Sequence, residues 1–314
     1  MHGLAYTRRH VSIPKRIVTG NYKDFMTATT SYNFQHFTGE RALFKTANAQ
    51  ITHCTFDDGE SPLKESHHLR ISDTTFGWKY PLWYCSGVEL SDSSLLDNAR
   101  AGIWYTSNLT VRNTAINAPK SFRKCTHVTI EDSTIPHAEE TLWNCSDVTL
   151  RNISASGDYF ALNTCDMTID NLQLDGNYAF DGSKNLTVRN SRLSTKDAFW
   201  NTENVTVYDS TITGEYIGWN SKNLTFVNCT IESNQGLCYI EGLTLKNCIV
   251  RNTDLAFEYC SDINAEITSP VLSIKNPMNG YISAPRIDEI IFDDPHIDSS
   301  ATTIVTADSL LTQE

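Results

Sequence analysis

The amino-acid sequence predicts an all-β fold: a right-handed, single-stranded parallel β-helix, wound around one core in coils of 18–21 residues. Two observations predict this class. Apolar residues recur in columns from one repeat to the next, and segments such as NLTVRN alternate between apolar and polar residues. An alternation with a period of two is typical of strands, and a repeat of about 20 residues is typical of solenoids.

Each repeat contains an anchor residue, which is apolar and in most repeats lies two positions before an Asn or Asp. The anchors are Ile51, Ile71, Leu90, Val111, Ile130, Leu150, Ile169, Val188, Val207, Phe226, Leu245 and Ile263. They predict about eleven coils, stacked about 4.8 Å apart. A leucine-rich repeat is the alternative fold at this period, but the sequence lacks its L-x-x-L-x-L frame.

Further apolar columns accompany the anchors and predict three short strands in each coil. Around Val188, for example, they hold Leu186, Leu193 and Phe180. The Asn or Asp after each anchor predicts a bend, because both residues tolerate left-handed backbone geometry. Cysteine exchanges with Ser and Thr in two columns, so the nine cysteines are predicted to be small buried residues rather than disulfide partners.

The repeat also divides the chain. We expect an N-terminal extension or cap at residues 1–35, the parallel β-helix at 36–268, and a C-terminal β-rich cap and tail at 269–314, with no second independent domain. Solenoids need such caps, because open strand edges invite association.

Composition excludes several classes of protein. A net charge of −12 argues against general nucleic-acid binding, and no apolar run approaches a membrane span. The N-terminus lacks the apolar stretch of a signal peptide, so a cytoplasmic location is expected. The nine histidines show no metal-ligand spacing, and no P-loop, H-E-x-x-H or G-x-S-x-G motif is present. We therefore predict no metal and no cofactor.

One segment of each repeat is variable, as GEYIGWN and GNYAFDG show, and is predicted to be an exposed strand that shapes a trough along the axis. Its outward column contains Phe44, Lys64, Trp83, Trp104, Arg123, Trp143, Asp181, Trp200 and Trp219. Next to it, small residues are expected to form the floor: Ala42, Pro62, Pro81, Gly102, Ser121, Thr141, Ala179 and Ala198. Five of six tryptophans in one column favour a binding site. The structural alternative is a stack of like residues across strands.

An oligosaccharide or other small molecule is the expected ligand, because sugar rings pack on aromatic rings and their hydroxyls bond charged groups. Single-stranded nucleic acid also stacks on aromatics but needs a strongly positive groove. The predicted substrate-binding residues are Glu60, Lys64, Lys79, Trp83, Tyr84, Trp104, Tyr105, Trp143, Tyr159, Tyr178, Trp200, Glu215, Tyr216 and Trp219. The oligomeric state is not predicted.

Catalysis is a further hypothesis for the middle of the trough. Glycoside hydrolysis needs two carboxyl groups, and neighbouring coils can supply the required spacings. The candidate acids are Glu140, Asp158, Asp181 and Asp197; a lyase would use a base such as Arg100, Lys120 or Arg123. The sequence thus favours a glycoside hydrolase or polysaccharide lyase. A non-catalytic glycan-binding protein and a protein-interaction scaffold remain the alternatives.

The stretches TGERALFK, DGESPLKES, KYPLWY, ARAGIWYT, ETLWNC, GDYF, KDAFWN and GEYIGWNSKNLT resemble a bacterial family whose members carry a domain of unknown function. The resemblance runs from about Phe37 to Glu289 and implies a right-handed β-helix of the pectin-lyase-like class. It implies no reaction, and the catalytic Asp triads and calcium-binding acids of pectate lyases and polygalacturonases find no match here.

Overall fold

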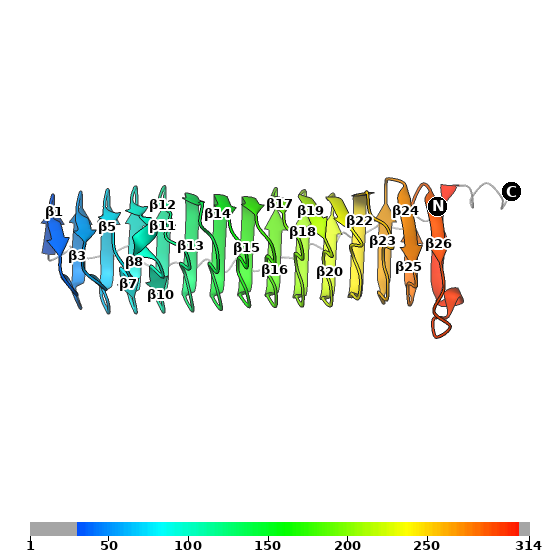
Figure 1. Ribbon diagram of the computed structural model, residues 1–314, viewed down its shortest axis with the longest axis horizontal. Coiled ribbons are helices and arrows are strands. Elements are labelled where there is room, and N and C mark those ends of the chain that lie inside the picture. Colours follow the sequence, from blue (N-terminus) through cyan, green and yellow to red (C-terminus); the bar gives the residue numbers. More distant parts are fainter. Residues whose placement is uncertain (1–29, 308–314) are drawn as a thin grey trace, which may run out of the picture.

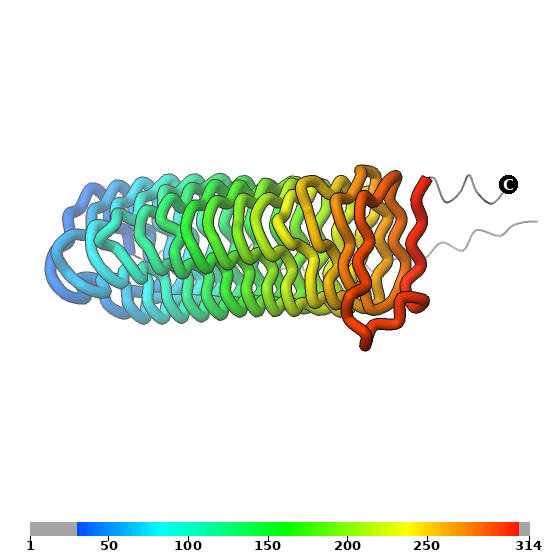
Figure 2. Tube along the Cα trace, turned by 45° about the vertical axis from the view of Figure 1, so that its right-hand side comes forward, coloured from blue at the N-terminus to red at the C-terminus, as the bar shows by residue number. Residues whose placement is uncertain are grey.

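The computed structural model describes residues 30–307 and is a parallel β-helix of about 15 turns (Figure 1). The predicted fold class is confirmed, but the predicted number of about eleven coils is too low. Additional coils lie before Ile51 and after Ile263, where the anchor pattern is not recognisable in the sequence. Figure 2 shows the coils side by side along one elongated tube.

The anchor strands form one parallel row along the tube. In order they are β1 (Thr30–Asn33), β3 (Ala47–Thr52), β5 (His67–Ser72), β8 (Ser86–Ser91), β11 (Ser107–Arg112), β13 (Thr126–Ile135), β14 (Ser146–Ser156), β15 (Cys165–Asp175), β16 (Lys184–Arg189), β18 (Glu203–Tyr208), β20 (Lys222–Val227), β22 (Glu241–Arg251), β23 (Ile263–Ile267), β25 (Gly280–Ser283) and β27 (Thr302–Val305). Anchors pair directly, as Val111 with Ile130 and Ile130 with Leu150.

A second row follows the bend in each coil. Its separate strands are β2 (His36–Thr38), β4 (Thr55–Asp57), β6 (Thr75–Phe76), β9 (Ser94–Leu95), β12 (Ala115–Ile116), β17 (Arg192–Ser194), β19 (Thr211–Glu215) and β21 (Thr230–Asn234). In β13, β14, β15 and β22 the strand continues through the bend. Outside the two rows lie the pair β7 (Leu82–Trp83) and β10 (Ile103–Trp104), the pair β24 (Val271–Lys275) and β26 (Ile287–Ile291), and the 3-10 turns η1 (Asp97–Ala99) and η2 (Ser299–Ala301).

The variable segment is built mainly of turns, so the prediction of a third strand in every coil is wrong. Between residues 39 and 260, the strand-like parts of this side are β7, β10 and isolated bridges through Arg123 and Ala256. The cause is left-handed backbone at non-glycine residues, for example Tyr178 (φ 58°) and Phe180 (φ 66°). Hydrogen bonds between coils offset the energetic cost of this left-handed geometry. The Phe180 N–H, for example, donates to the Phe160 carbonyl at 2.8 Å. We call this side the turn face.

The turns also change which residues face inward. Phe180 is buried as predicted, but its small neighbour Ala179 is buried too. The same holds for the other small residues of that column except Ala42, so the prediction that they form an exposed floor is wrong. Strict alternation fails because a left-handed residue turns the next side chain back toward the core.

One coil exchanges large and small core residues. Phe160 is aligned with Thr141 and Ala179, whereas Ala161 is aligned with Leu142 and Phe180. The volume of the pair is thereby conserved, which a close-packed core tolerates well. Leu162 lies in the outward column between Trp143 and Asp181, a residue that the predicted column omitted.

The cysteines of the described residues are all free, and all except Cys165 are buried. The Cys85 thiol lies 3.1 Å from the Leu63 carbonyl oxygen, and burial raises its pKa to about 12. These thiols therefore act as small core residues with weak hydrogen bonds.

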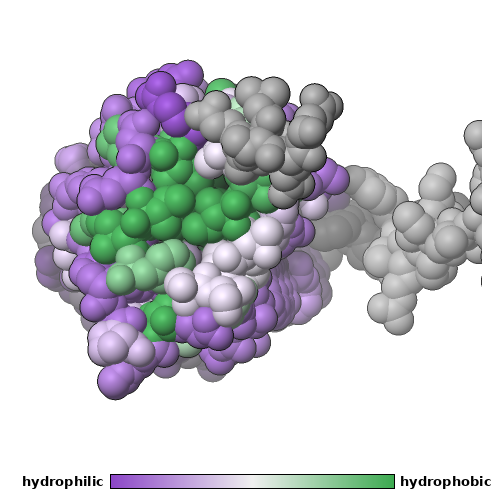
Figure 3. Space-filling view, turned by 90° about the vertical axis from the view of Figure 1, so that its right-hand side faces the viewer, coloured by the Kyte–Doolittle hydropathy of each residue, from purple (hydrophilic) through white to green (hydrophobic). Residues whose placement is uncertain are grey.

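The described residues present an apolar surface at the C-terminal end of the tube. Figure 3 shows apolar side chains gathered across this end. Leu272, Met278, Tyr281 and Ile290 are among the most exposed large apolar residues. In residues 30–307 no helix has the length and apolar character needed to cross a membrane.

Candidate functional site

The tryptophans of the turn face stack along the tube axis. The Trp83 and Trp104 rings are nearly parallel, with centroids 5.0 Å apart. The Arg123 guanidinium lies 4.6 Å from the centroid of the Trp104 ring and 4.5 Å from that of Trp143. Because neighbouring coils cover the ring faces in this stack, a ligand meets mainly ring edges there.

The indole N–H groups are also used within the fold. Trp83 Nε1 donates to the Ala101 carbonyl at 2.6 Å, and Trp104 Nε1 donates to the Lys120 carbonyl at 2.8 Å. Trp143 and Trp200 make the same contact with Tyr159 and Tyr216 at 2.7 Å. Each indole thus connects two coils, so the tryptophan column has a structural role whatever it binds.

The tryptophan wall is interrupted by Leu162 and Asp181. The Asp181 carboxylate accepts a hydrogen bond from Asn201 Nδ2 at 2.8 Å, and Asn220 continues the same ladder to Asn201 at 2.8 Å. Asp181 therefore ends a ladder of side-chain hydrogen bonds along the tube. Its carboxylate is the N-terminal member and accepts the last hydrogen bond.

Glu140 and Asp158 are also held by their own contacts. Glu140 bonds Lys120 at 3.0 Å and Arg123 at 2.8 Å. Burial opposes ionisation, yet these two cations hold the pKa of Glu140 below its usual value. Asp158 Oδ1 accepts the Asn177 backbone N–H at 2.7 Å. Glu140 is therefore suited to remain an anion rather than to donate a proton.

Asp197 differs from these acids. Its side chain is 2% exposed, and its Oδ1 atom has no hydrogen-bond partner among the described residues. Burial raises the pKa of Asp197; Glu215 adds to this, while Lys196 and a hydrogen bond from Tyr178 oppose it. A buried carboxyl group with a raised pKa is the kind of group that donates protons in enzymes.

A hollow of about 350 Å³ opens at the N-terminal part of the turn face. We call it the aromatic hollow; its lining includes Tyr80, Trp83, Arg100, Trp104 and Lys120. The Tyr80 and Trp83 rings lie 4.5 Å apart. Within residues 30–307 the Arg100 guanidinium has no ion pair or side-chain hydrogen bond, so its donors face solvent and a ligand.

The hollow brings together some of the predicted site residues. Trp83, Trp104, Arg100 and Lys120 line it, whereas most of the predicted substrate-binding residues form pairs elsewhere on the turn face. These pairs are Lys64 over Tyr84 (5.6 Å), Tyr84 with Tyr105 (4.7 Å), Tyr159 with Tyr178 (4.7 Å), Trp200 with Trp219 (5.9 Å), Lys79 with Glu60 (2.9 Å) and Lys196 with Glu215 (3.1 Å). Tyr80 and Pro119 line the hollow but were not predicted. The i, i+3 spacing of Tyr80 and Trp83 could have revealed the first.

A family model described as "Protein of unknown function (DUF3737)" matches residues 30–305. The chain belongs to the DUF3737 family. Among curated proteins, none matches the sequence significantly.

Solved structures similar to this DUF3737 chain share little sequence with it. The tailspike protein of Escherichia coli bacteriophage HK620, in complex with a hexasaccharide, has 8% identity and a TM-score of 0.41, over 83% of this chain and 71% of that chain. The surface adhesin PfbA of Streptococcus pneumoniae has 10% identity and a TM-score of 0.38, over 83% and 84%. The mannuronan C-5 epimerase AlgE4 A-module of Azotobacter vinelandii has 12% identity and a TM-score of 0.28, over 88% and 91%. These superpositions are weak, so none assigns a ligand or reaction to this chain.

The Arg123 guanidinium, which lies between the Trp104 and Trp143 rings, gives a prediction about the stability of the turn face. We call this arrangement the Arg123 sandwich. Arg123→Ala removes two ring contacts and one partner of Glu140, so we expect a loss of about 2 kcal/mol in the free energy of unfolding. Chemical denaturation measures it. Lys124→Ala is the control, because Lys124 is exposed and its side chain, among residues 30–307, interacts only with the Tyr105 ring, whose centroid lies 5.7 Å from Nζ. Equal losses in both variants would contradict a structural role for the sandwich.

Proposed function

We propose that this protein binds an oligosaccharide on its turn face, with the aromatic hollow as the primary site. The observation that carries the proposal is the hollow itself, where three aromatic side chains meet the unpaired Arg100 guanidinium. Ligand sites are concave and largely apolar with a few convergent polar groups, and Trp, Tyr and Arg dominate binding energies. The edges of Trp83 and Trp104 offer apolar contact to sugar C–H groups, and Arg100 and Lys120 offer donors to hydroxyls.

Cleavage of the bound glycan is the second candidate, and Asp197 is the observation that favours it. Glycoside hydrolysis needs one protonated carboxyl and one ionised carboxylate. The raised pKa of Asp197, caused mainly by burial, suits the first role. Glu215, which pairs with Lys196 at 3.1 Å and adds to the raised pKa of Asp197, is the candidate for the second. Binding nevertheless has the stronger support, because Glu140, Asp158 and Asp181 are engaged in contacts of the fold.

A panel of neutral and acidic oligosaccharides tests the binding proposal by calorimetry. Trp83→Ala and Trp104→Ala should each weaken binding of the best ligand by roughly tenfold, equivalent to about 1.4 kcal/mol. Trp219→Ala is the matched control: Trp219 is a half-buried tryptophan of the same column, stacked on Tyr239 and outside the hollow. Failure of the native protein to bind any member of the panel, or equal losses in all three variants, would refute the aromatic hollow as a glycan site.

The same panel separates an enzyme from a binder when it is scored for new reducing ends and for unsaturated products. If Asp197 is the acid of a hydrolase, Asp197→Asn abolishes product release while binding at the hollow persists. Product release that is unchanged in this variant would exclude Asp197 from the reaction. A cytoplasmic location remains a prediction, which fractionation of the native host can check.

A further inference from the structure

We propose that the glycan site is not confined to the aromatic hollow but continues around one corner of the tube to a second groove, and that this path selects a long, uncharged polysaccharide chain. This inference rests on the proposed function and specifies its ligand. The second groove has a volume of about 550 Å³ and lies over the second-row ends of β13, β14, β15 and β17. We call it the serine groove.

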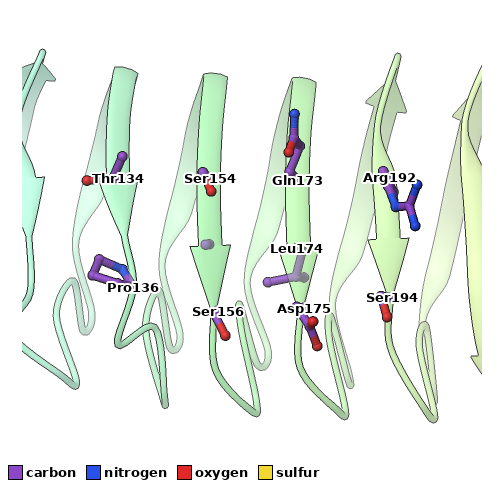
Figure 4. A pocket seen from close by; sticks show the side chains of 10 residues that line it. Thr134, Pro136, Ser154, Ser156, Gln173, Leu174, Asp175, Arg192 and Ser194 are labelled. Carbon is purple, nitrogen blue, oxygen red and sulfur yellow. The ribbon is translucent and has the colours of Figure 1, made fainter.

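The shape of the serine groove follows from the sizes of side chains in neighbouring coils. Figure 4 shows Ser154 and Ser156 on one coil, with Pro136 on the coil before it and Gln173 on the coil after it. The two serines are small and leave a depression between taller neighbours. Ala155 and Leu174 contribute apolar surface to its lining. A depression with polar groups and some apolar surface suits a sugar chain.

Polar side chains of the serine groove have no partner in the fold. Gln173, Asp175 and Arg192 make no side-chain hydrogen bond or ion pair with any residue between 30 and 307. Several charges of neighbouring coils elsewhere on the tube are paired; Glu131, for example, bonds both Arg112 and Arg151. The amide, carboxylate and guanidinium in the groove are therefore free to donate to and accept from sugar hydroxyls.

A third hollow supplies the proposed connection between the two. It is lined by Asp97, Pro119, Lys120, His137 and Glu139, and we call it the corner hollow. Pro119 and Lys120 line the aromatic hollow as well. At the other side, His137 directly follows Pro136 of the serine groove in the chain. The aromatic and corner hollows thus share two lining residues, and the corner hollow adjoins the serine groove along the chain. The proposed path runs through all three, from Trp83 to Arg192.

The length of the path sets the length of the ligand. From the coil of Trp83 to the coil of Arg192 the chain advances five coils, roughly 24 Å at about 4.8 Å per coil, before the lateral distance around the corner is added. Since one pyranose unit is about as long as one coil spacing, a chain that fills the path has on the order of five or more sugar units.

The charge of the path argues against a polyanionic ligand. Its cations are Arg100, Lys120 and Arg192, and its anions are Asp97, Glu139 and Asp175, so three positive groups meet three negative ones. Lys120 is moreover paired with Glu140 at 3.0 Å. In a chain of net charge −12, such a balanced path offers a polyuronate no net attraction. Hydrogen bonding to hydroxyls remains, and its strength depends little on salt.

The test measures affinity against chain length and charge with the native protein and full-length variants. The probes are xylo-, cello- and malto-oligosaccharides from disaccharide to octasaccharide, with oligogalacturonates of equal length for comparison. One neutral series should gain roughly tenfold in affinity from the shortest to the longest chain. The double variant Gln173→Ala, Arg192→Ala should lose this gain while its affinity for the disaccharide stays unchanged. Arg251→Ala is the matched control, an exposed arginine of β22 outside the groove.

Each of the other possible results would refute a different part of the proposal. Disaccharide binding without any gain in affinity with length, or the same loss in Arg251→Ala, refutes the path but leaves binding at the aromatic hollow intact. Tighter binding of oligogalacturonates than of every neutral series refutes the uncharged ligand. No binding of any probe by the native protein refutes both this inference and the proposed function.

Discussion

Phe199→Ala is expected to lower the free energy of unfolding by about 3–5 kcal/mol, the range for removing a large aromatic side chain from a packed core. Phe199 is fully buried and stacks on Phe180, with ring centroids 5.2 Å apart; Phe226 packs against it at 6.2 Å. The cavity left by the Phe199 ring cannot close by the movement of a single strand, because hydrogen bonds between coils fix the spacing of the turns along the axis. The cavity therefore persists, and Tm should fall by roughly 6–12 °C.

Calorimetry and urea unfolding measure this loss. Phe34→Ala is the control: Phe34 is 74% exposed and contacts His53 at the N-terminal end, so its removal should change stability by less than about 0.5 kcal/mol. A β-helix is nearly one-dimensional, so the damage should also be local. Hydrogen exchange should accelerate most in β16, β18 and β20. A loss for Phe199→Ala no larger than for Phe34→Ala would contradict the inward assignment of its column.

The two strand rows could be predicted from the sequence because buried and exposed side chains alternate regularly along them. Anchors such as Val111 and Ile130 pair directly, and a period of two assigns their side chains to the core. The turn face could not be predicted in the same way. Its left-handed residues include Tyr178, Phe180 and Lys120, types that carry no turn signature, since the hydrogen bonds between coils stabilise the geometry rather than local preference.

The candidate site, too, could be predicted only in part from the sequence. Five tryptophans in one column indicated an unusual surface, and Trp83, Trp104, Arg100 and Lys120 do line one hollow. The roles of the acids depend on contacts between coils that no single repeat contains. Whether Asp181 bonds Asn201, or Glu140 is shared between Lys120 and Arg123, follows from the register of two neighbouring coils. The serine groove arises from small serines between taller neighbours, a pattern without any motif.

Asp197→Asn is expected to stabilise the protein at neutral pH. The native carboxyl is 2% exposed with an unbonded Oδ1, and its pKa is raised by burial and by Glu215, against the opposing effects of Lys196 and Tyr178. At neutral pH the fold must therefore either bury this charge or retain a proton that the unfolded chain has released. Asparagine has nearly the same shape and no charge, so we expect a gain of about 1–3 kcal/mol.

The pH dependence of this gain distinguishes a charge effect from a packing effect. Because the folded pKa of Asp197 lies above its unfolded value of about 3.9, the native carboxyl imposes no ionisation cost below that value. The cost grows as pH rises from the unfolded pKa to the folded pKa and is constant above the folded pKa. The Tm difference between Asp197→Asn and the native protein should therefore be smallest near pH 4 and reach its plateau once the pH exceeds the folded pKa. Asp262→Asn, at an exposed bend, is the control and should show no such slope. A gain that is independent of pH would assign the effect to packing, and destabilisation at every pH would show that a satisfied carboxylate had been lost.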